Sequence, residues 1–164
     1  MSTIPRAHSP LDLRRPLAQP LRMTPQLRRK LAAAYTALAG GMDAVTGPWL
    51  VFAPASALAA MGVEAEDDTL FVSWVGAFVG AVGWSYLWAL WRWWKLGDTA
   101  FLRSVWRVTI LFRLAAGSYC AAQIALDLLD PAWFTVPLAD FLLAGVQIWL
   151  LRAGWPEPGN AETA

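Results

Sequence analysis

The chain has 164 residues, 57% of them hydrophobic and 15% charged, with a formal net charge of +1. This balance is too apolar for an ordinary water-soluble domain of the same length. Crossing about 30 Å of hydrocarbon takes about 20 predominantly apolar residues, and four segments qualify: about 31–53, 70–91, 105–128 and 133–151. The sequence therefore predicts an all-α integral membrane four-helix bundle over residues 24–152, with an extended N-terminal tail.

The first 23 residues are predicted to form a basic, Pro-rich cytoplasmic tail. Prolines at positions 5, 10, 16 and 20 are too closely spaced for a helix. No apolar run followed by a cleavage site precedes the first long span, so the tail is not expected to be a signal peptide. Basic residues near a bilayer attract anionic lipids, by about 1 kcal/mol each. Docking of this tail onto a protein partner is the alternative.

The charges outside the spans separate by sign. The charged residues of the first and third loops are all acidic. The basic residues lie before the first span, around the second loop or after the fourth span. These basic residues are Arg6, Arg14, Arg15, Arg22, Arg28, Arg29, Lys30, Arg92, Lys95, Arg103, Arg107 and Arg152. By the positive-inside rule both termini are cytoplasmic, including the short tail 153–164, and the protein is expected in the bacterial inner membrane.

The predicted helix boundaries follow from local capping residues. Thr24 followed by Pro25 is a typical helix start, and Gly47 with Pro48 is expected to kink or end that helix before Pro54 closes it. Gly97 is a left-handed cap for the second long helix. Asp98 or Thr99 then caps the third helix. Pro131 lies in a very short loop, which makes the last two helices antiparallel neighbours.

The eleven tryptophans indicate where the spans meet the headgroups. Trp49, Trp74 and Trp133 lie at predicted outer ends, and most of the others lie near inner ends. The segment WRWWK (91–95) also resembles a basic stacking platform for nucleic acid. Because a span must end there, we expect an interfacial belt and no nucleic-acid binding. The deeper Trp84 and Trp88 are expected to pack or to face lipid.

Each predicted helix carries one stripe of small or polar residues at alternating spacings of three and four. Membrane helices associate through small residues and interhelical hydrogen bonds, so the stripes are expected to face inward. The small-xxx-small segment GAFVG (76–80) is assigned to internal packing rather than dimerisation. The stripes are Thr36, Gly40, Asp43 and Gly47; Ser73, Gly76, Gly80 and Gly83; Thr109, Arg113, Ala116, Cys120, Gln123 and Asp127; and Pro137, Asp140, Ala144 and Gln147.

Away from the ends of the predicted spans, three charged residues remain: Asp43, Arg113 and Asp140. A lone arginine at the bilayer centre costs about 2.5 to 3.5 kcal/mol or more, so Arg113 needs a partner. A helical rise of about 1.5 Å per residue, and the lean of side chains toward their own N-terminus, favour Asp43 as its first partner. The same lean tilts Asp140 toward Tyr119 and Gln123, although an extended Arg113 reaches both acids.

This group of charges leaves two interpretations open. In the first interpretation, the Asp43–Arg113 pair fixes helix register and packing and has no further role. Alternatively, Asp140 has no cation of its own and is held protonated by desolvation, as in proton relays, with Tyr119, Gln123 and Gln147 along the pathway. In a purely structural variant of the second interpretation, Asp140 is protonated but only forms hydrogen bonds to other helices and relays no proton.

The sequence lacks the residues that several kinds of metal, cofactor and catalytic site require. The single histidine, His8, lies in the N-terminal tail and the single cysteine is Cys120, so we expect no haem, zinc or iron–sulfur site and no other metal or cofactor. Cys120 is expected to be a packing thiol, and the acidic run EAEDD (64–68) a solvated cluster. No nucleophile motif or phosphate loop occurs. The sequence therefore favours a protein that is not an enzyme.

The segment GMDAVTGPWLVFAP (41–54), followed by a glycine-rich second span, resembles the small bacterial four-helix membrane proteins that include the DoxX-like group. The resemblance covers the span layout, about residues 31–151, and implies a small partner of a membrane redox enzyme. We therefore expect an accessory or scaffold subunit of a larger membrane assembly. The alternative is a small carrier or proton-linked transporter that uses Asp43, Arg113 and Asp140.

Overall fold

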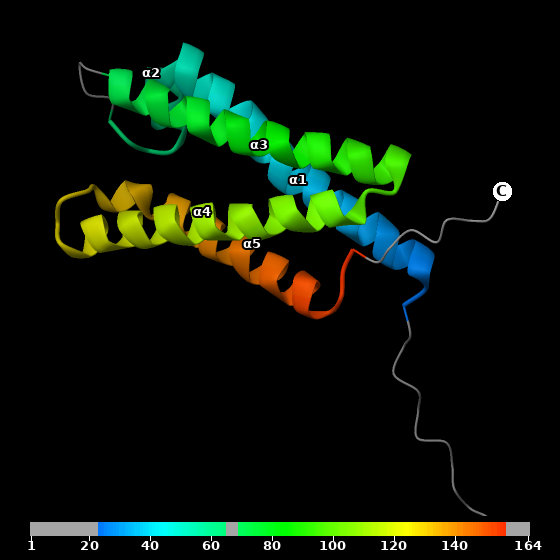
Figure 1. The fold of residues 1–164 in the computed structure, drawn as a ribbon. Helices are drawn as coiled ribbons and strands as arrows, with labels where there is room; N and C mark the ends of the chain where they lie inside the picture. The colour runs from blue at the N-terminus through cyan, green and yellow to red at the C-terminus, as the bar shows by residue number, and fades with distance from the viewer. Residues whose placement is uncertain (1–22, 65–68, 157–164) are drawn as a thin grey trace, which may run out of the picture.

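A computed structural model describes residues 23–64 and 69–156, and these residues form helices and no strands (Figure 1). The all-α prediction is confirmed for them. The predicted basic tail lies outside the described residues except for Met23, and so does the chain after Pro156. The elements in order are α1 (Pro25–Phe52), α2 (Pro54–Ala60), α3 (Leu70–Leu96), α4 (Thr99–Ala125), the short 3₁₀ segment η1 (Pro131–Phe134) and α5 (Thr135–Arg152).

Within the described part of the chain, three helical segments are long and apolar enough to cross a membrane: α3, α4 and the continuous stretch Pro131–Arg152. Helix α1 is longer, at 28 residues, but its glycines and its polar and charged residues make it less apolar than these three. Three of the four predicted spans thus meet the requirement.

The long helices form two pairs. Helix α1 packs chiefly against α3, and α4 packs chiefly against α5. Figure 1 shows α3 and α4 joined by a tight turn at one end and diverging toward the end where α2 and η1 lie. The predicted antiparallel pairing of the last two helices is confirmed, because η1 and its short loop return the chain directly onto α4.

Glycines bring α1 and α3 into close contact. A Cβ atom added to Gly47 would overlap the backbone of Gly80, and one added to Gly83 would overlap the backbone at Ala44. A Cβ on Gly76 would lie 2.6 Å from Cβ of Leu50. Close backbone approach of this kind is how small residues hold membrane helices together. The GAFVG segment therefore serves internal packing, as predicted.

The capping residues lie where the sequence predicts them. Thr24 Oγ1 accepts a hydrogen bond from Leu27 N at 3.3 Å at the start of α1. Gly97 ends α3 with φ +69°, and Asp98 Oδ1 accepts from Phe101 N at 3.0 Å to begin α4. Of the two predicted caps for α4, the structure selects Asp98.

Helix α1 ends at Phe52, just before Pro54, as predicted, and it does not end at Gly47 and Pro48. Pro54 then starts helix α2, which was not predicted. One boundary prediction needs correction. The third span was predicted to reach residue 128, but α4 ends at Ala125. Asp127 follows with φ +54°, a left-handed conformation that acidic and amide side chains tolerate and that an α-helix does not continue.

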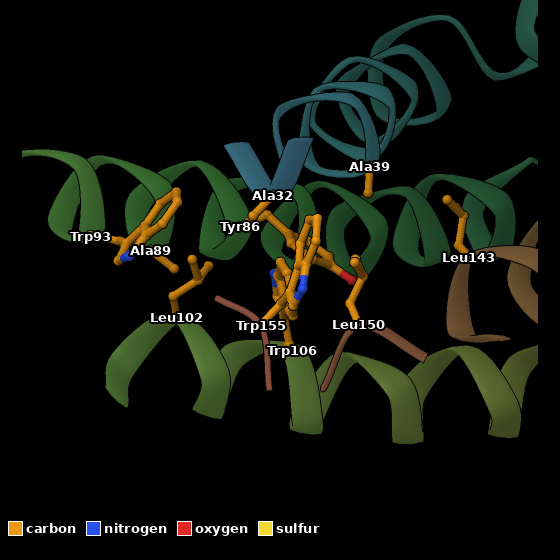
Figure 2. Close-up of a cluster of buried hydrophobic side chains, with 10 residues drawn as sticks. All are labelled: Ala32, Ala39, Tyr86, Ala89, Trp93, Leu102, Trp106, Leu143, Leu150 and Trp155. Carbon is orange, nitrogen blue, oxygen red and sulfur yellow. The ribbon is translucent and has the colours of Figure 1, made fainter. Parts of the chain in front are cut away.

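Several tryptophans lie in the core rather than in a headgroup belt. Figure 2 shows Trp106 and Trp155 beside Tyr86 and Leu150, with Trp93 at one end of the cluster. Trp106 is fully buried, and Trp93 and Trp155 are each 3% exposed. The belt prediction is wrong for these three, because they pack inside the bundle core. For Trp155 the turn after α5 is the cause, since it brings Trp155 N onto the carbonyl of Leu150 at 2.9 Å. Trp84 and Trp88 are exposed, as expected of lipid-facing residues.

Candidate functional site

Arg113 lies near the middle of α4 and contacts an acid on each of two other helices. Its Nη2 atom donates to Asp43 Oδ2 of α1 at 2.5 Å, and its Nη1 atom donates to Asp140 Oδ1 of α5 at 2.9 Å. The side chains of Arg113, Asp43 and Asp140 are 6%, 11% and 14% exposed. We call these three residues the charged triad; it joins three helices through one guanidinium group.

The structure thereby corrects one sequence-based argument. Asp43 is a partner of Arg113, as the spacing predicted. Asp140, however, is not left without a cation, because Arg113 extends far enough to reach both carboxylates. The argument for a protonated relay residue rested on an unpaired Asp140, and that premise does not hold here.

A buried polar network adjoins the triad. Gln147 Nε2 donates to Tyr86 Oη at 2.7 Å and to Thr109 Oγ1 at 3.0 Å. The guanidinium carbon of Arg113 lies 5.8 Å from the centre of the Tyr86 ring, a distance at which cation and ring attract each other. Tyr35 Oη donates to the carbonyl of Leu143 at 2.9 Å. Hydrogen bonds and ring contacts therefore link all four long helices.

Sequence reasoning placed Gln147 in the polar core but overlooked Tyr35 and Tyr86. Tyr86 is completely buried. It follows Gly83 by three residues, so helical spacing puts it on the inward stripe of α3. An aromatic ring with a hydroxyl group at such a position was the signal that could have identified it.

Two other predicted site residues lie apart from the triad. Tyr119 is 65% exposed, and neither it nor the half-buried Gln123 is hydrogen-bonded to the triad. The inward stripe of α4 holds for Thr109 and Arg113, but Ala116 and Asp127 are exposed. Because α4 diverges from α3 beyond Arg113, the far half of its stripe has no helix to face, and Gly117 packs against α5 instead.

The divergence of α3 and α4 leaves a groove with a cavity volume of about 780 Å³. All three triad residues line this groove, together with side chains of α3 and α4 that are almost entirely apolar or aromatic. The charged groups are thus buried from bulk solvent yet accessible from the groove. Such a concave, largely apolar space with a few convergent polar groups is typical of ligand-binding sites.

The buried polar atoms without a hydrogen-bond partner among the described residues include Arg113 Nε, Gln147 Oε1 and Trp106 Nε1. Within the same residues, no group of three or more His, Cys, Asp or Glu side chains is arranged to hold a metal ion. Cys120 is a free, half-buried thiol. The contacts that the described residues of the site make are charge pairs and hydrogen bonds.

Comparisons with known proteins give no match: no family model fits the chain, and neither a curated protein nor a solved structure is significantly similar to it.

Proposed function

We propose that the chain is a four-span protein of the bacterial inner membrane with both termini in the cytoplasm. Three apolar segments have the length to cross a bilayer. Helix α1 lies against α3 through glycine contacts from Gly40 to Gly47, so a bilayer that surrounds α3 also surrounds α1. The acidic first loop and the basic residues around the second loop support this orientation.

Within the membrane, we propose that the protein acts as a non-enzymatic accessory or scaffold subunit of a larger assembly. The observation that carries this proposal is the double pairing of Arg113, which uses both intramembrane acids to tie α1, α4 and α5 together. Buried ion pairs of this kind can specify one helix arrangement. The layout resemblance to DoxX-like proteins, which implies a small partner of a redox enzyme, supports the same function.

Purification from native membranes in mild detergent tests the accessory function. We expect a companion membrane protein that co-elutes at fixed stoichiometry through affinity and size-exclusion steps. A variant that lacks residues 1–22 shows whether the basic tail or the helical surface holds the companion. A lone, monodisperse protein that supports its native phenotype without any companion would contradict the proposal.

A second candidate function, a small proton-linked carrier, is supported by a separate observation: all three triad residues line the same open groove. Proteoliposomes with an internal pH-sensitive dye test this function. A carrier predicts proton flux that Asp140→Asn abolishes while the protein remains folded. If the protein is an accessory subunit, the wild type shows no proton flux, and the Asp140→Asn variant still co-purifies with the companion protein.

A further inference from the structure

The charged triad holds one more acid than base. Asp43 and Asp140 each give one oxygen to Arg113, and no described residue donates a hydrogen bond to the other oxygen of either carboxylate. Arg113 is the one basic side chain among the described residues that line the groove. With both acids ionised, the groove therefore presents a net negative charge that the surrounding side chains do not neutralise.

The walls of the groove suit an apolar cation rather than a hydrated metal ion. Trp74 and Phe78 on α3 stack edge to face with centroids 4.6 Å apart, and Phe112 contributes a ring from α4. Aromatic faces attract organic cations, most strongly where water is excluded. An anionic headgroup would instead meet two carboxylates and an arginine whose two terminal nitrogens are already engaged.

We propose that the groove between α3 and α4 binds a lipophilic cation, a small molecule with a single positive charge on an apolar or aromatic body. The charge lies against the free carboxylate oxygens of Asp43 and Asp140, and the body lies between the aromatic walls. The volume of about 780 Å³ falls within the range of about 300 to 1,000 Å³ usual for small-molecule sites.

This inference goes beyond the accessory function and does not depend on it, because a subunit that holds a companion through its outer surface can also bind a ligand in its groove. It gives the carrier alternative a substrate class. Binding and transport are measured separately, so failure of the binding test leaves the companion result untouched.

The experiment measures binding of tritiated tetraphenylphosphonium to the full chain in detergent. Binding is detected by a scintillation proximity assay, and protein-free micelles give the background. Tetraphenylmethane, which has nearly the same shape and no charge, is the competitor that separates charge from hydrophobicity. We expect saturable binding of the cation that tetraphenylmethane does not displace. Displacement by tetraphenylmethane at comparable concentration, or no saturable binding, overturns the proposal.

Variants locate the site. Asp140→Asn and Asp43→Asn each remove the excess negative charge and should weaken binding at least about tenfold, the loss expected for one charged contact. Asp127→Asn makes the same chemical change at an exposed position outside the groove and should bind like wild type. Equal affinity in all three variants contradicts the assignment.

A steric variant covers the case in which the acid variants fail to fold. Ala116 is exposed and lines the groove, so Ala116→Phe fills the space without altering any charge or buried contact. We expect a normal size-exclusion profile and a comparable loss of tetraphenylphosphonium binding. Undiminished binding in a folded Ala116→Phe protein places the ligand elsewhere and overturns the proposal.

Discussion

At the scale of single residues, Arg113 determines how the bundle accommodates charge. Its two terminal nitrogens each pair with one carboxylate, so removal of one acid leaves the guanidinium with the other. Removal of the arginine leaves two acids in low dielectric without a cation. The three residues are therefore not equivalent, although all of them belong to one network.

We predict that Arg113→Leu lowers the free energy of unfolding by about 3 to 5 kcal/mol, the usual cost of breaking a buried pair. Asp43→Asn and Asp140→Asn should each cost less, about 1 to 3 kcal/mol. The double variant Asp43→Asn/Asp140→Asn should exceed the sum of its singles, because it strands the arginine. Unfolding in increasing fractions of denaturing detergent gives these values; additive single effects would contradict the shared pairing.

At the scale of elements, the contact between α1 and α3 depends on glycine. Along this interface the backbones are too close for a Cβ at Gly47 or Gly83. Gly41 lies on the same helix as Gly47, but no atom of a neighbouring helix lies within 4 Å of the position its Cβ would occupy. The two helices therefore carry both critical glycines and a glycine whose replacement should be harmless.

We predict that Gly47→Ala and Gly83→Ala each destabilise the protein by about 1 to 3 kcal/mol, because the overlap forces the helices apart. Gly41→Ala is the matched control, and it should stabilise α1 by about 0.5 to 1 kcal/mol, since alanine favours helix more than glycine does. Thermal unfolding of the three purified variants measures the difference. Equal effects at all three positions would show that α1 and α3 are not in contact as described.

At the scale of the whole molecule, the two helix pairs and the position of α1 decide the topology. A four-span arrangement puts the loop after α2 on the side opposite to the N-terminal tail. If α1 instead lay on the membrane surface, both segments would be on the same side. The glycine contacts with α3 favour the first arrangement.

We predict that, in a Cys120→Ser background, a membrane-impermeant maleimide labels Glu64→Cys in intact spheroplasts and labels Ser9→Cys only after lysis. The positive-inside distribution and the packing of α1 against α3 are the physical reasons. Lysed membranes provide the control that both cysteines are reactive. Labelling of both positions from the outside would rule out a span at α1.

The amino-acid sequence by itself determined the four long helices, the caps at Thr24, Gly97 and Asp98, and the faces that α1 and α3 bury. Thr24, Gly97 and Asp98 act through neighbours within one turn, and a stripe such as Thr36–Gly40–Asp43–Gly47 follows from helical periodicity alone, so these features were predictable. The pairing of Asp43 with Arg113 also followed, since both depth and side-chain direction depend on position along a helix.

The tertiary structure alone decided how far apart the helices lie. Glycines bring α1 and α3 into backbone contact, whereas α3 and α4 diverge beyond their connecting turn, and no spacing along one helix encodes that difference. The divergence opens the groove, and the turn after α5 brings Trp155 back onto the core that also buries Trp106. The contact between Arg113 and Asp140 likewise depends on the distance between two helices, which only their packing sets.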